Sequence, residues 1–260
     1  IKDVVDGFGV VRLDEALEIR EHSSKPILAM QGVYSSDAYD LLKQNDIWSV
    51  IHSISQLPLA KQYQNNLTFW IKLNTGMNRL GFEISDFIKI YKKYLKEKQF
   101  TLMSHLASSN DKESSSNESQ FKLFNDLSNQ LNKNILKSIA NTGCIMNFPE
   151  FSLDWVRCGI GIYGGYLNDD QLKTAMTLRS PIINIRSIKK GDKVGYDGRA
   201  VAKNDMKIAS VYLGYADGLP VTIKDGTSVM VRDQIAKVFG KVSMDLTTID
   251  VTNISNCRIG

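Results

Sequence analysis

A lysine, an asparagine and an arginine interrupt the segment WIKLNTGMNRLGFE (residues 70–83), which otherwise has the pattern of a buried strand followed by a glycine-rich loop. Successive side chains of a strand point to opposite faces. This alternation predicts two faces, with Trp70, Lys72 and Asn74 on one and Phe69, Ile71 and Leu73 on the other. A buried lysine must be neutral, paired with an anion or covalently modified. Lys72 is therefore a candidate for a chemical role.

Arg79 follows in the loop, between Gly76 and Gly81. Glycine lets a backbone approach a ligand closely, so Arg79 is a candidate ligand-binding residue. The alternative interpretation is an arginine of an ordinary turn.

Polar residues also follow three later apolar runs: His105 in LMSHLAS, Asn141 and Thr142 in IANTG, and Arg157 in DWVRCGIGIYG. A lone histidine is usually a core or surface residue. Small polar groups beside a glycine, as at Asn141 and Thr142, can hold a phosphate or another polar ligand. A buried Arg157 needs an acceptor, and none is obvious nearby in the sequence.

The remaining candidates lie in loops. Gly159 and Gly161 flank Ile160, and backbone N–H groups after the last strands of a βα barrel often bind phosphate. Further along, Tyr215 stands in the turn-prone GYADG, and Met244 and Asp245 interrupt a strand pattern. Ordinary interpretations exist for these three as well: Tyr215 can be a turn aromatic that packs its ring, and Met244 and Asp245 can form a β-bulge.

The elements that would position these residues alternate along the first two-thirds of the chain. Seven apolar runs are strand candidates, residues 7–11, 26–30, 48–53, 67–75, 100–108, 136–143 and 154–164. Helical patterns separate most of them, and a serine can cap the helix within SSDAYDLLKQN. This alternation is typical of a parallel sheet with crossover helices. Seven strands are one short of a closed eight-stranded βα barrel, so the chain is expected to begin at the second strand.

The pattern changes near residue 172. Short β-branched runs and Gly-Asp or Asp-Gly turns follow, without a good helix. We therefore expect a TIM-like α/β barrel domain over residues 1–170, incomplete at its N-terminus, and an all-β domain over residues 171–260, incomplete at its C-terminus.

Composition narrows the class of protein. The chain has 260 residues, 43% of them hydrophobic and 23% charged, and a net charge of +4 with scattered basic residues. This argues against nucleic-acid binding. No apolar run approaches the roughly 20 residues of a membrane span. The three cysteines have no metal-ligand spacing and favour a reducing compartment, so we expect a cytoplasmic protein without a metal.

Six segments together resemble alanine racemase, a fold-type III pyridoxal-phosphate enzyme: KLNTGMNRLGF, SHLAS, IANTG, DWVRCGIGIYG, VYLGYADGLP and GKVSMDLTTIDV. They occur in the family's order and cover nearly the whole chain. The resemblance implies a βα barrel followed by a β domain, and a homodimer whose active sites each use both subunits. It also implies pyridoxal 5'-phosphate as cofactor and alanine as substrate, with D-alanine supplied for cell-wall peptidoglycan.

The resemblance also implies a role for each candidate. Arg157 matches the arginine that donates to the cofactor's pyridine nitrogen, and Arg79 the arginine near its phenolic oxygen and the substrate carboxylate. Asn141, Thr142, Gly159 and Ile160 match cofactor-binding positions, the last three at the phosphate. Tyr215 matches the catalytic tyrosine, and His105 matches the histidine that hydrogen-bonds it. Met244 and Asp245 match residues that the dimer mate contributes at the substrate entrance.

Lys72 matches a lysine that many members have as a carbamate paired with the Arg79 position. The carbamate hypothesis would make Lys72 an anion that orients Arg79. Asn74 departs from the aspartate that is common at its position.

The largest departure concerns the family's Schiff-base lysine, which lies on the first barrel strand in a segment like KANAYGHG. No such segment occurs in these 260 residues, and neither does the family's C-terminal tyrosine that helps hold the phosphate. We therefore expect a racemase sequence that lacks both ends. The alternatives are a racemase of broader specificity, a decarboxylase of the same fold type, a non-catalytic pyridoxal-phosphate-binding fragment, or Lys72 itself as the Schiff-base lysine.

Overall fold

The computed structural model describes residues 1–166 and 172–260 and divides into two compact units, Ile1–Ala175 and Met176–Gly260. The expected boundary between residues 170 and 171 lies outside the described residues. Each unit has its own sheet, and each is described by itself.

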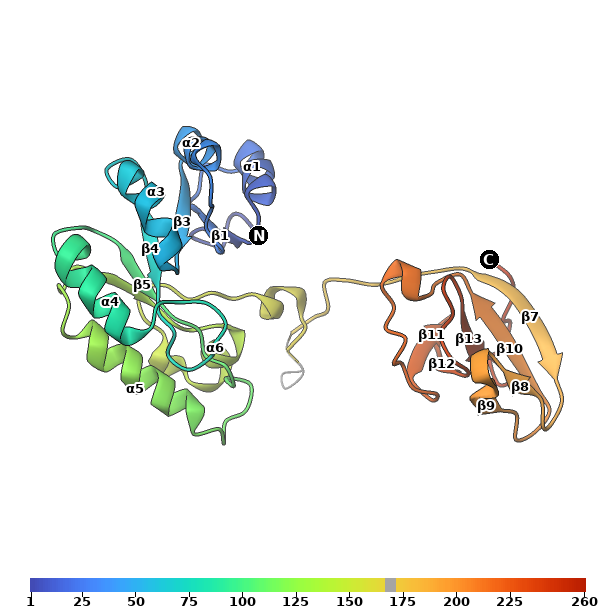
Figure 1. Cartoon of the computed structure of the whole chain (residues 1–260). Coiled ribbons are helices and arrows are strands. Elements are labelled where there is room, and N and C mark those ends of the chain that lie inside the picture. The colour runs from blue at the N-terminus through green and yellow to red at the C-terminus, as the bar shows by residue number, and fades with distance from the viewer. Residues whose placement is uncertain (167–171) are drawn as a thin grey trace. The chain divides into compact units, whose positions relative to one another are not determined.

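The first unit contains a six-stranded parallel sheet in which every strand pairs with its neighbour in the sequence (Figure 1). The strands are β1 (Phe8–Val10), β2 (Ile27–Ala29), β3 (Ile47–Ile51), β4 (Phe69–Lys72), β5 (Thr101–Met103) and β6 (Leu136–Ser138). Parallel neighbours bring all their carboxyl ends to one edge. This confirms the expected TIM-like α/β arrangement as an open part of a barrel.

Helices fill the connections between these strands, and further helices follow β6. They are α1 (Leu13–His22), α2 (Ser36–Gln44), α3 (Leu57–Tyr63), α4 (Ile84–Ile90), which continues as the π-helix η2 (Tyr91–Leu95), α5 (Ser116–Ser128) and α6 (Thr142–Asn147), with short 3-10 helices η1 (Ile54–Gln56) and η3 (Pro149–Phe151). The predicted serine cap is Ser35, whose hydroxyl accepts from the backbone N–H of Ala38 at 3.3 Å.

The two faces of the sheet have different side chains. Phe69, Ile71 and Leu73 belong to the large core between sheet and helices. Trp70 belongs to a smaller cluster with Trp48 and Trp155. The alternation predicted for this strand is therefore confirmed, and Lys72 lies in phase with Trp70.

The seventh predicted strand, residues 154–164, is not a strand. It makes one parallel bridge, between Asn141 and Arg157, and then turns into the 3-10 helix η4 (Ile160–Tyr163). The N–H groups of Gly159 and Gly161 donate to the side-chain hydroxyl of Thr142 instead of to a neighbouring strand. A strand ladder cannot continue where its donors are used in this way.

The second unit is an antiparallel β domain, as the sequence predicts. Its five-stranded sheet has the order β11 (Ser228–Val231), β12 (Gln234–Val238), β13 (Thr247–Asp250), β10 (Met206–Val211) and β7 (Ile182–Ile188). A second ladder pairs β8 (Lys193–Val194) with β9 (Ala200–Val201), and 3-10 helices η5 (Tyr196–Gly198) and η6 (Tyr215–Asp217) lie in loops. The apolar core includes Ala209, Val238 and Ile249.

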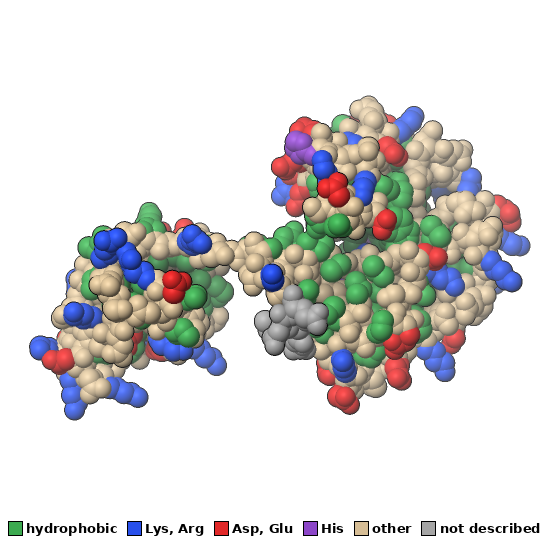
Figure 2. Space-filling model, turned by 180° about the vertical axis from the view of Figure 1, so that it is seen from behind, with side chains coloured by type: hydrophobic (Ala, Val, Ile, Leu, Met, Phe, Trp, Pro, Cys, Tyr) green, Lys and Arg blue, Asp and Glu red, His purple; other side chains and the backbone are tan. Residues whose placement is uncertain are grey.

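The surface of the first unit has charges of both signs. Figure 2 shows lysine and arginine side chains interspersed with carboxylates on its visible face. Within residues 1–166 and 172–260, no helix combines the length and the apolar character that crossing a membrane requires.

Candidate active site

The carboxyl edge of the parallel sheet gathers four of the predicted residues. Lys72 is the last residue of β4, His105 follows β5, Asn141 follows β6, and Arg157 pairs with Asn141 through the isolated bridge. Side chains of the last three are in contact. A guanidinium nitrogen of Arg157 lies 3.4 Å from Nδ1 of His105, and the amide nitrogen of Asn141 lies 3.3 Å from Nε2.

Lys72 is a buried amine among cations. Only 6% of the residue is exposed, although lysine is almost never this buried without a partner. Desolvation, together with the positive charges of Arg79 and Arg157, lowers the pKa of Lys72 to about 8. Among the described residues Lys72 forms no ion pair with a carboxylate. The sequence left open that Lys72 is paired with an anion, and no such acidic partner lies among the described residues.

Arg157 finds the acceptors that the sequence did not reveal. Its guanidinium donates to the hydroxyl of Ser138, to the carbonyl of Ser104 at 2.5 Å and to the carbonyl of Ile139 at 3.3 Å. Ser104 and Ser138 follow or end the adjacent strands β5 and β6, so the sheet order brings them together. Burial lowers the pKa of Arg157 to about 10, which leaves the side chain charged at neutral pH.

His105 is neutral in this setting. Burial lowers the pKa of its imidazole to about 3, and the charges of Arg157, Lys72 and Arg79 act in the same direction. Arginine and the amide nitrogen of Asn141 can only donate, so donors face both ring nitrogens of His105. A neutral imidazole accepts at one nitrogen and carries its proton on the other.

Asn141 has a structural role beside its place in the site. Its Oδ1 accepts from the N–H of Cys144 at 3.1 Å and so caps α6. The same oxygen accepts from the hydroxyl of Ser109 at 2.6 Å. Ser109 was not among the predicted residues, because it lies in a serine-rich loop whose contacts depend on the fold.

Thr142 and the glycines after Arg157 form a small cradle. The hydroxyl of Thr142 accepts from the N–H groups of Gly159 at 3.1 Å and Gly161 at 3.2 Å. A methyl group on Gly161 would lie 2.8 Å from a carbon of Thr142, so the close approach requires glycine. At Gly159, by contrast, no described atom lies within 4 Å of the position that a Cβ would take, and Ile160 is 55% exposed. The cradle therefore has open space beside Gly159.

Arg79 lies on a tightly turned loop after β4. Leu73 and Phe82 form a parallel bridge at its base. Gly81 has a φ of 126°, and a methyl group there would lie 2.5 Å from the backbone nitrogen of Asn74. The loop thus needs glycine at this position. Arg79 itself is exposed, yet its charge is close enough to affect Lys72.

The second unit brings together the other predicted residues. The N–H groups of Tyr215 and Ala216 donate to the carbonyls of Ser243 and Met244 at 3.0 and 2.9 Å. Gly214 fits only as glycine, because a methyl group there would lie 2.2 Å from the Met244 carbonyl oxygen. Tyr215 is 41% exposed and Met244 is 54% exposed. Asp245, next in sequence, is exposed as well.

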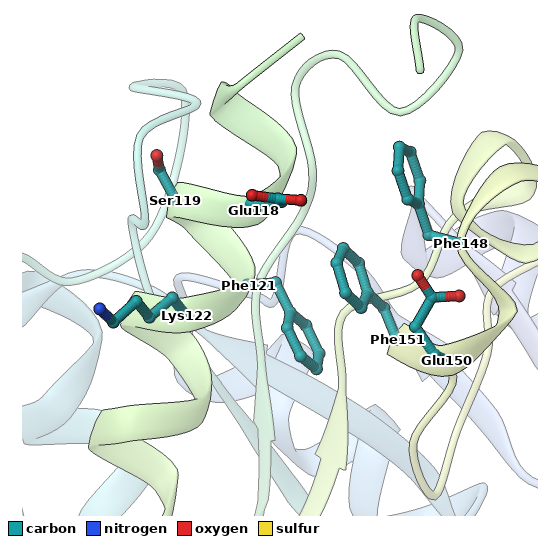
Figure 3. Close-up of a pocket in the computed structure, with 7 residues that line it drawn as sticks. All are labelled: Glu118, Ser119, Phe121, Lys122, Phe148, Glu150 and Phe151. Carbon is teal, nitrogen blue, oxygen red and sulfur yellow. The ribbon is translucent and has the colours of Figure 1, made fainter. Parts of the chain in front are cut away.

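A cavity of about 460 Å³ lies away from these residues, between α5 and η3. Figure 3 shows its walls, which include three phenylalanines and two glutamates: Phe121, Phe148, Phe151, Glu118 and Glu150. The rings of Phe121 and Phe151 stack at 3.8 Å and join the helix to the loop that follows α6. None of the predicted site residues lines this cavity, so its volume is no guide to the chemistry at the strand ends.

Comparison with known proteins gives one family. Residues 1–167 match the family model described as alanine racemase, N-terminal domain, and residues 175–260 match alanine racemase, C-terminal domain. An alanine racemase of Alteromonas mediterranea is 35% identical, over 100% of this chain and 75% of its own length.

Solved structures agree with the sequence comparison. The biosynthetic alanine racemase from Pseudomonas aeruginosa superposes with a TM-score of 0.90 and 31% identity, over 99% of this chain and 75% of that one. The alanine racemase from Bartonella henselae, determined with covalently bound pyridoxal phosphate, has a TM-score of 0.82 and 26% identity, over 98% of this chain and 74% of that one. Two family models that together span almost every residue show that this chain belongs to the alanine racemase family.

Proposed function

We propose that the natural protein is an isomerase that interconverts L- and D-alanine with pyridoxal 5'-phosphate as its cofactor. The observation that best supports this is Arg157, a charged donor placed at the carboxyl edge of the sheet between His105 and two strand-end serines. Its Nε is buried and, within the described residues, has no hydrogen-bond partner. Buried donors of this kind are uncommon and call for an explanation.

The donors at this edge fit the cofactor. Arg79 and Arg157 are cationic donor groups, and the cofactor has a phosphate, a phenolic oxygen and a pyridine nitrogen. Arg157 would donate to the pyridine nitrogen and Arg79 would bind near the phenolic oxygen and the substrate carboxylate. The phosphate would lie beside Thr142, Gly159 and Ile160, where the backbone leaves open space, with Asn141 beside it.

Pyridoxal phosphate, when bound, supplies an electron-withdrawing ring that acidifies the α-proton of an amino acid. Arg157 would modulate this ring without protonating it, because a guanidinium with a pKa of about 10 keeps its own proton at neutral pH. An unprotonated ring nitrogen makes the ring a weaker electron sink. This favours simple return of the proton over side reactions of a long-lived carbanion.

Lys72 is proposed to react with carbon dioxide. The neutral amine nitrogen forms a bond to the carbon of CO₂ and releases one proton, which leaves an anionic carbamate. A pKa of about 8 provides neutral amine near physiological pH. The anion would replace an unpaired buried cation by an ion pair with Arg79, and burial among positive charges supports this choice over an unmodified lysine.

Tyr215 is proposed as the base for one enantiomer, with a lysine serving the opposite face. A phenol holds its proton at neutral pH, so it needs hydrogen bonding or nearby positive charge to ionise. His105, as a neutral imidazole, has one ring N–H that would donate to the phenolate oxygen. Tyr215 belongs to the β domain, and we propose that it reaches the barrel of a partner subunit in a homodimer, with Met244 and Asp245 at the substrate entrance.

The product D-alanine would supply cell-wall peptidoglycan synthesis in the cytoplasm. The direct test is racemisation of L-alanine by the natural protein with pyridoxal phosphate, with D-alanine measured by a stereospecific oxidase. Other small amino acids tested alongside distinguish an alanine racemase from one of broad specificity. Binding of the cofactor without racemisation of any amino acid would contradict the proposal.

A second experiment tests the role of Lys72. Borohydride reduction of the cofactor-bound protein, followed by peptide mapping, identifies the residue to which the cofactor is attached. We expect no cofactor on the peptide that contains Lys72. Cofactor on that peptide would show that Lys72 is the attachment site and would overturn the carbamate assignment.

A further inference from the structure

The loop that contains Arg79 is organised by one side-chain amide. Oδ1 of Asn74 accepts from the N–H of Gly76 at 3.2 Å and from the N–H of Asn78 at 3.0 Å. Nδ2 of Asn74 donates to Oδ1 of Asn78 at 2.9 Å and to Oε1 of Glu83 at 2.7 Å. A carboxamide has two donor hydrogens and two acceptor lone pairs, and all four are used.

These four bonds connect the two ends of the loop. Asn74 directly follows the Leu73–Phe82 bridge, and Glu83 is the residue before α4. The N–H of Asn74 donates to the carbonyl of Phe82, and the N–H of Phe82 donates to the carbonyl of Lys72. Asn78, with a φ of 57°, stands immediately before Arg79. The backbone conformation from which Arg79 projects therefore depends on Asn74.

We propose that Asn74 and Glu83 form a positioning pair that fixes the Arg79 loop, and that the carboxamide at position 74 is matched to the carboxylate at position 83. The proposal rests on the proposed function, since it concerns where Arg79 meets the substrate carboxylate. Asn74 and Glu83 are positioning residues, because they act through the loop.

The match has a specific consequence for substitutions. Asn74→Asp keeps the size and both acceptor bonds but loses the donors, and it places two carboxylates at hydrogen-bond distance. Glu83→Gln keeps an acceptor oxygen for Nδ2 of Asn74. In the double variant, the new amide of residue 83 donates to the new carboxylate of residue 74, and rotation of the Asn78 carboxamide turns its NH₂ toward the same carboxylate. Of the four proteins, namely wild type, the two single variants and the double variant, only Asn74→Asp should therefore have a defective Arg79 loop.

The first measurement needs neither cofactor nor activity. Amide hydrogen exchange of residues 73–83 at pH 8 should be about tenfold faster or more in Asn74→Asp, because a charge-assisted bond is replaced by repulsion. It should be close to wild type in Glu83→Gln and restored in the double variant. Asn66→Asp, at an exposed position before β4, is the control for adding a charge.

Two results would overturn the positioning pair: exchange in Asn74→Asp that equals that in the control, or a defect that Glu83→Gln does not repair. A pH profile of the exchange rate distinguishes repulsion between the two carboxylates from a general loss of structure. Protonating one of the two facing carboxylates should restore the hydrogen bond, so the excess exchange of Asn74→Asp, corrected for intrinsic rates, should disappear towards pH 4.

The second measurement concerns the reaction. In the natural protein, Asn74→Asp should raise KM for alanine about tenfold and change kcat less, while the double variant returns to wild-type KM. Exchange that follows the predicted pattern with unchanged KM would overturn the positioning of Arg79 for substrate. A wild-type protein without racemase activity would instead contradict the proposed function, and hydrogen exchange would still decide whether the pair fixes the loop.

Discussion

Replacing Lys72 by methionine should stabilise the unmodified protein, although Lys72 lies at the centre of the candidate site. Methionine has a similar length, and the site is buried. Desolvation and two neighbouring arginines lower the pKa of Lys72 from 10.5 to about 8. Since one pKa unit corresponds to about 1.4 kcal/mol, holding this amine protonated costs the fold on the order of 3 kcal/mol at neutral pH. Lys72→Met removes that cost.

The pH dependence has a definite sign. Below pH 8 the amine is protonated in both the folded and the unfolded chain, so the full cost is present. Between pH 8 and 10.5 the folded protein releases its proton before the unfolded chain does, so the free energy of unfolding should rise with pH. The stabilising effect of Lys72→Met should shrink over the same interval.

Urea unfolding followed by tryptophan fluorescence measures this directly. All three tryptophans, Trp48, Trp70 and Trp155, lie in the first unit, so the signal reports the unfolding of that unit. Lys96→Met, at an exposed position, is the control for loss of a lysine.

Bicarbonate provides the second arm of the experiment. If Lys72 forms a carbamate, bicarbonate at pH 8 should stabilise wild type and leave Lys72→Met unchanged. The reasoning is refuted if Lys72→Met is less stable than wild type in buffer free of carbon dioxide. The carbamate is refuted if bicarbonate affects both proteins equally.

Two further predictions concern the neighbours of Lys72. His105 should not titrate between pH 8 and 5 in an NMR experiment, because burial and nearby cations lower its pKa to about 3. The folded state then binds fewer protons than the unfolded chain, so the free energy of unfolding should fall as pH drops from 6.5 towards 3. An imidazole midpoint near 6.5 would contradict this. Arg157→Met should lower the free energy of unfolding of the first unit by about 2 kcal/mol or more, because it leaves the acceptors at Ser104, Ser138 and Ile139 without their donor. The control Arg12→Met, at an exposed position, should have no measurable effect. Equal effects of the two substitutions would show that the hydrogen bonds of Arg157 are dispensable.

The strand pattern was predictable because its cause is local. A strand has a period of two, and the residue types from Phe69 to Leu73 are enough to place Lys72 in phase with Trp70. The change to an antiparallel β domain was predictable for the same reason, since turn residues and β-branched runs replace helical spacing.

The contacts of Arg157 were not predictable from the sequence. Its acceptors at Ser104 and Ser138 are 53 and 19 residues away along the chain. They become neighbours only because β5 and β6 are adjacent in the sheet. Residue types can indicate that a buried arginine needs an acceptor, but the order and register of strands decide which acceptor it meets.

The seventh strand failed as a prediction for a similar reason. Its apolar residues have the composition of a strand, but Gly159 and Gly161 donate to Thr142, which follows another strand. Competition from a side chain distant in sequence has no local signal. The amide of Asn74 is a further case, because its partner Glu83 is indicated by neither spacing nor periodicity.

The measurement that tests the central claim most directly is α-proton exchange in the natural protein with Tyr215→Phe. The variant keeps the ring and loses the hydroxyl, so it should still bind pyridoxal phosphate and should lose racemisation. In D₂O, NMR should show deuterium entering the α-position of one enantiomer of alanine and not of the other, because the lysine face is untouched. Exchange of both enantiomers at wild-type rates, or continued racemisation, would contradict the assignment of Tyr215 as one of two bases.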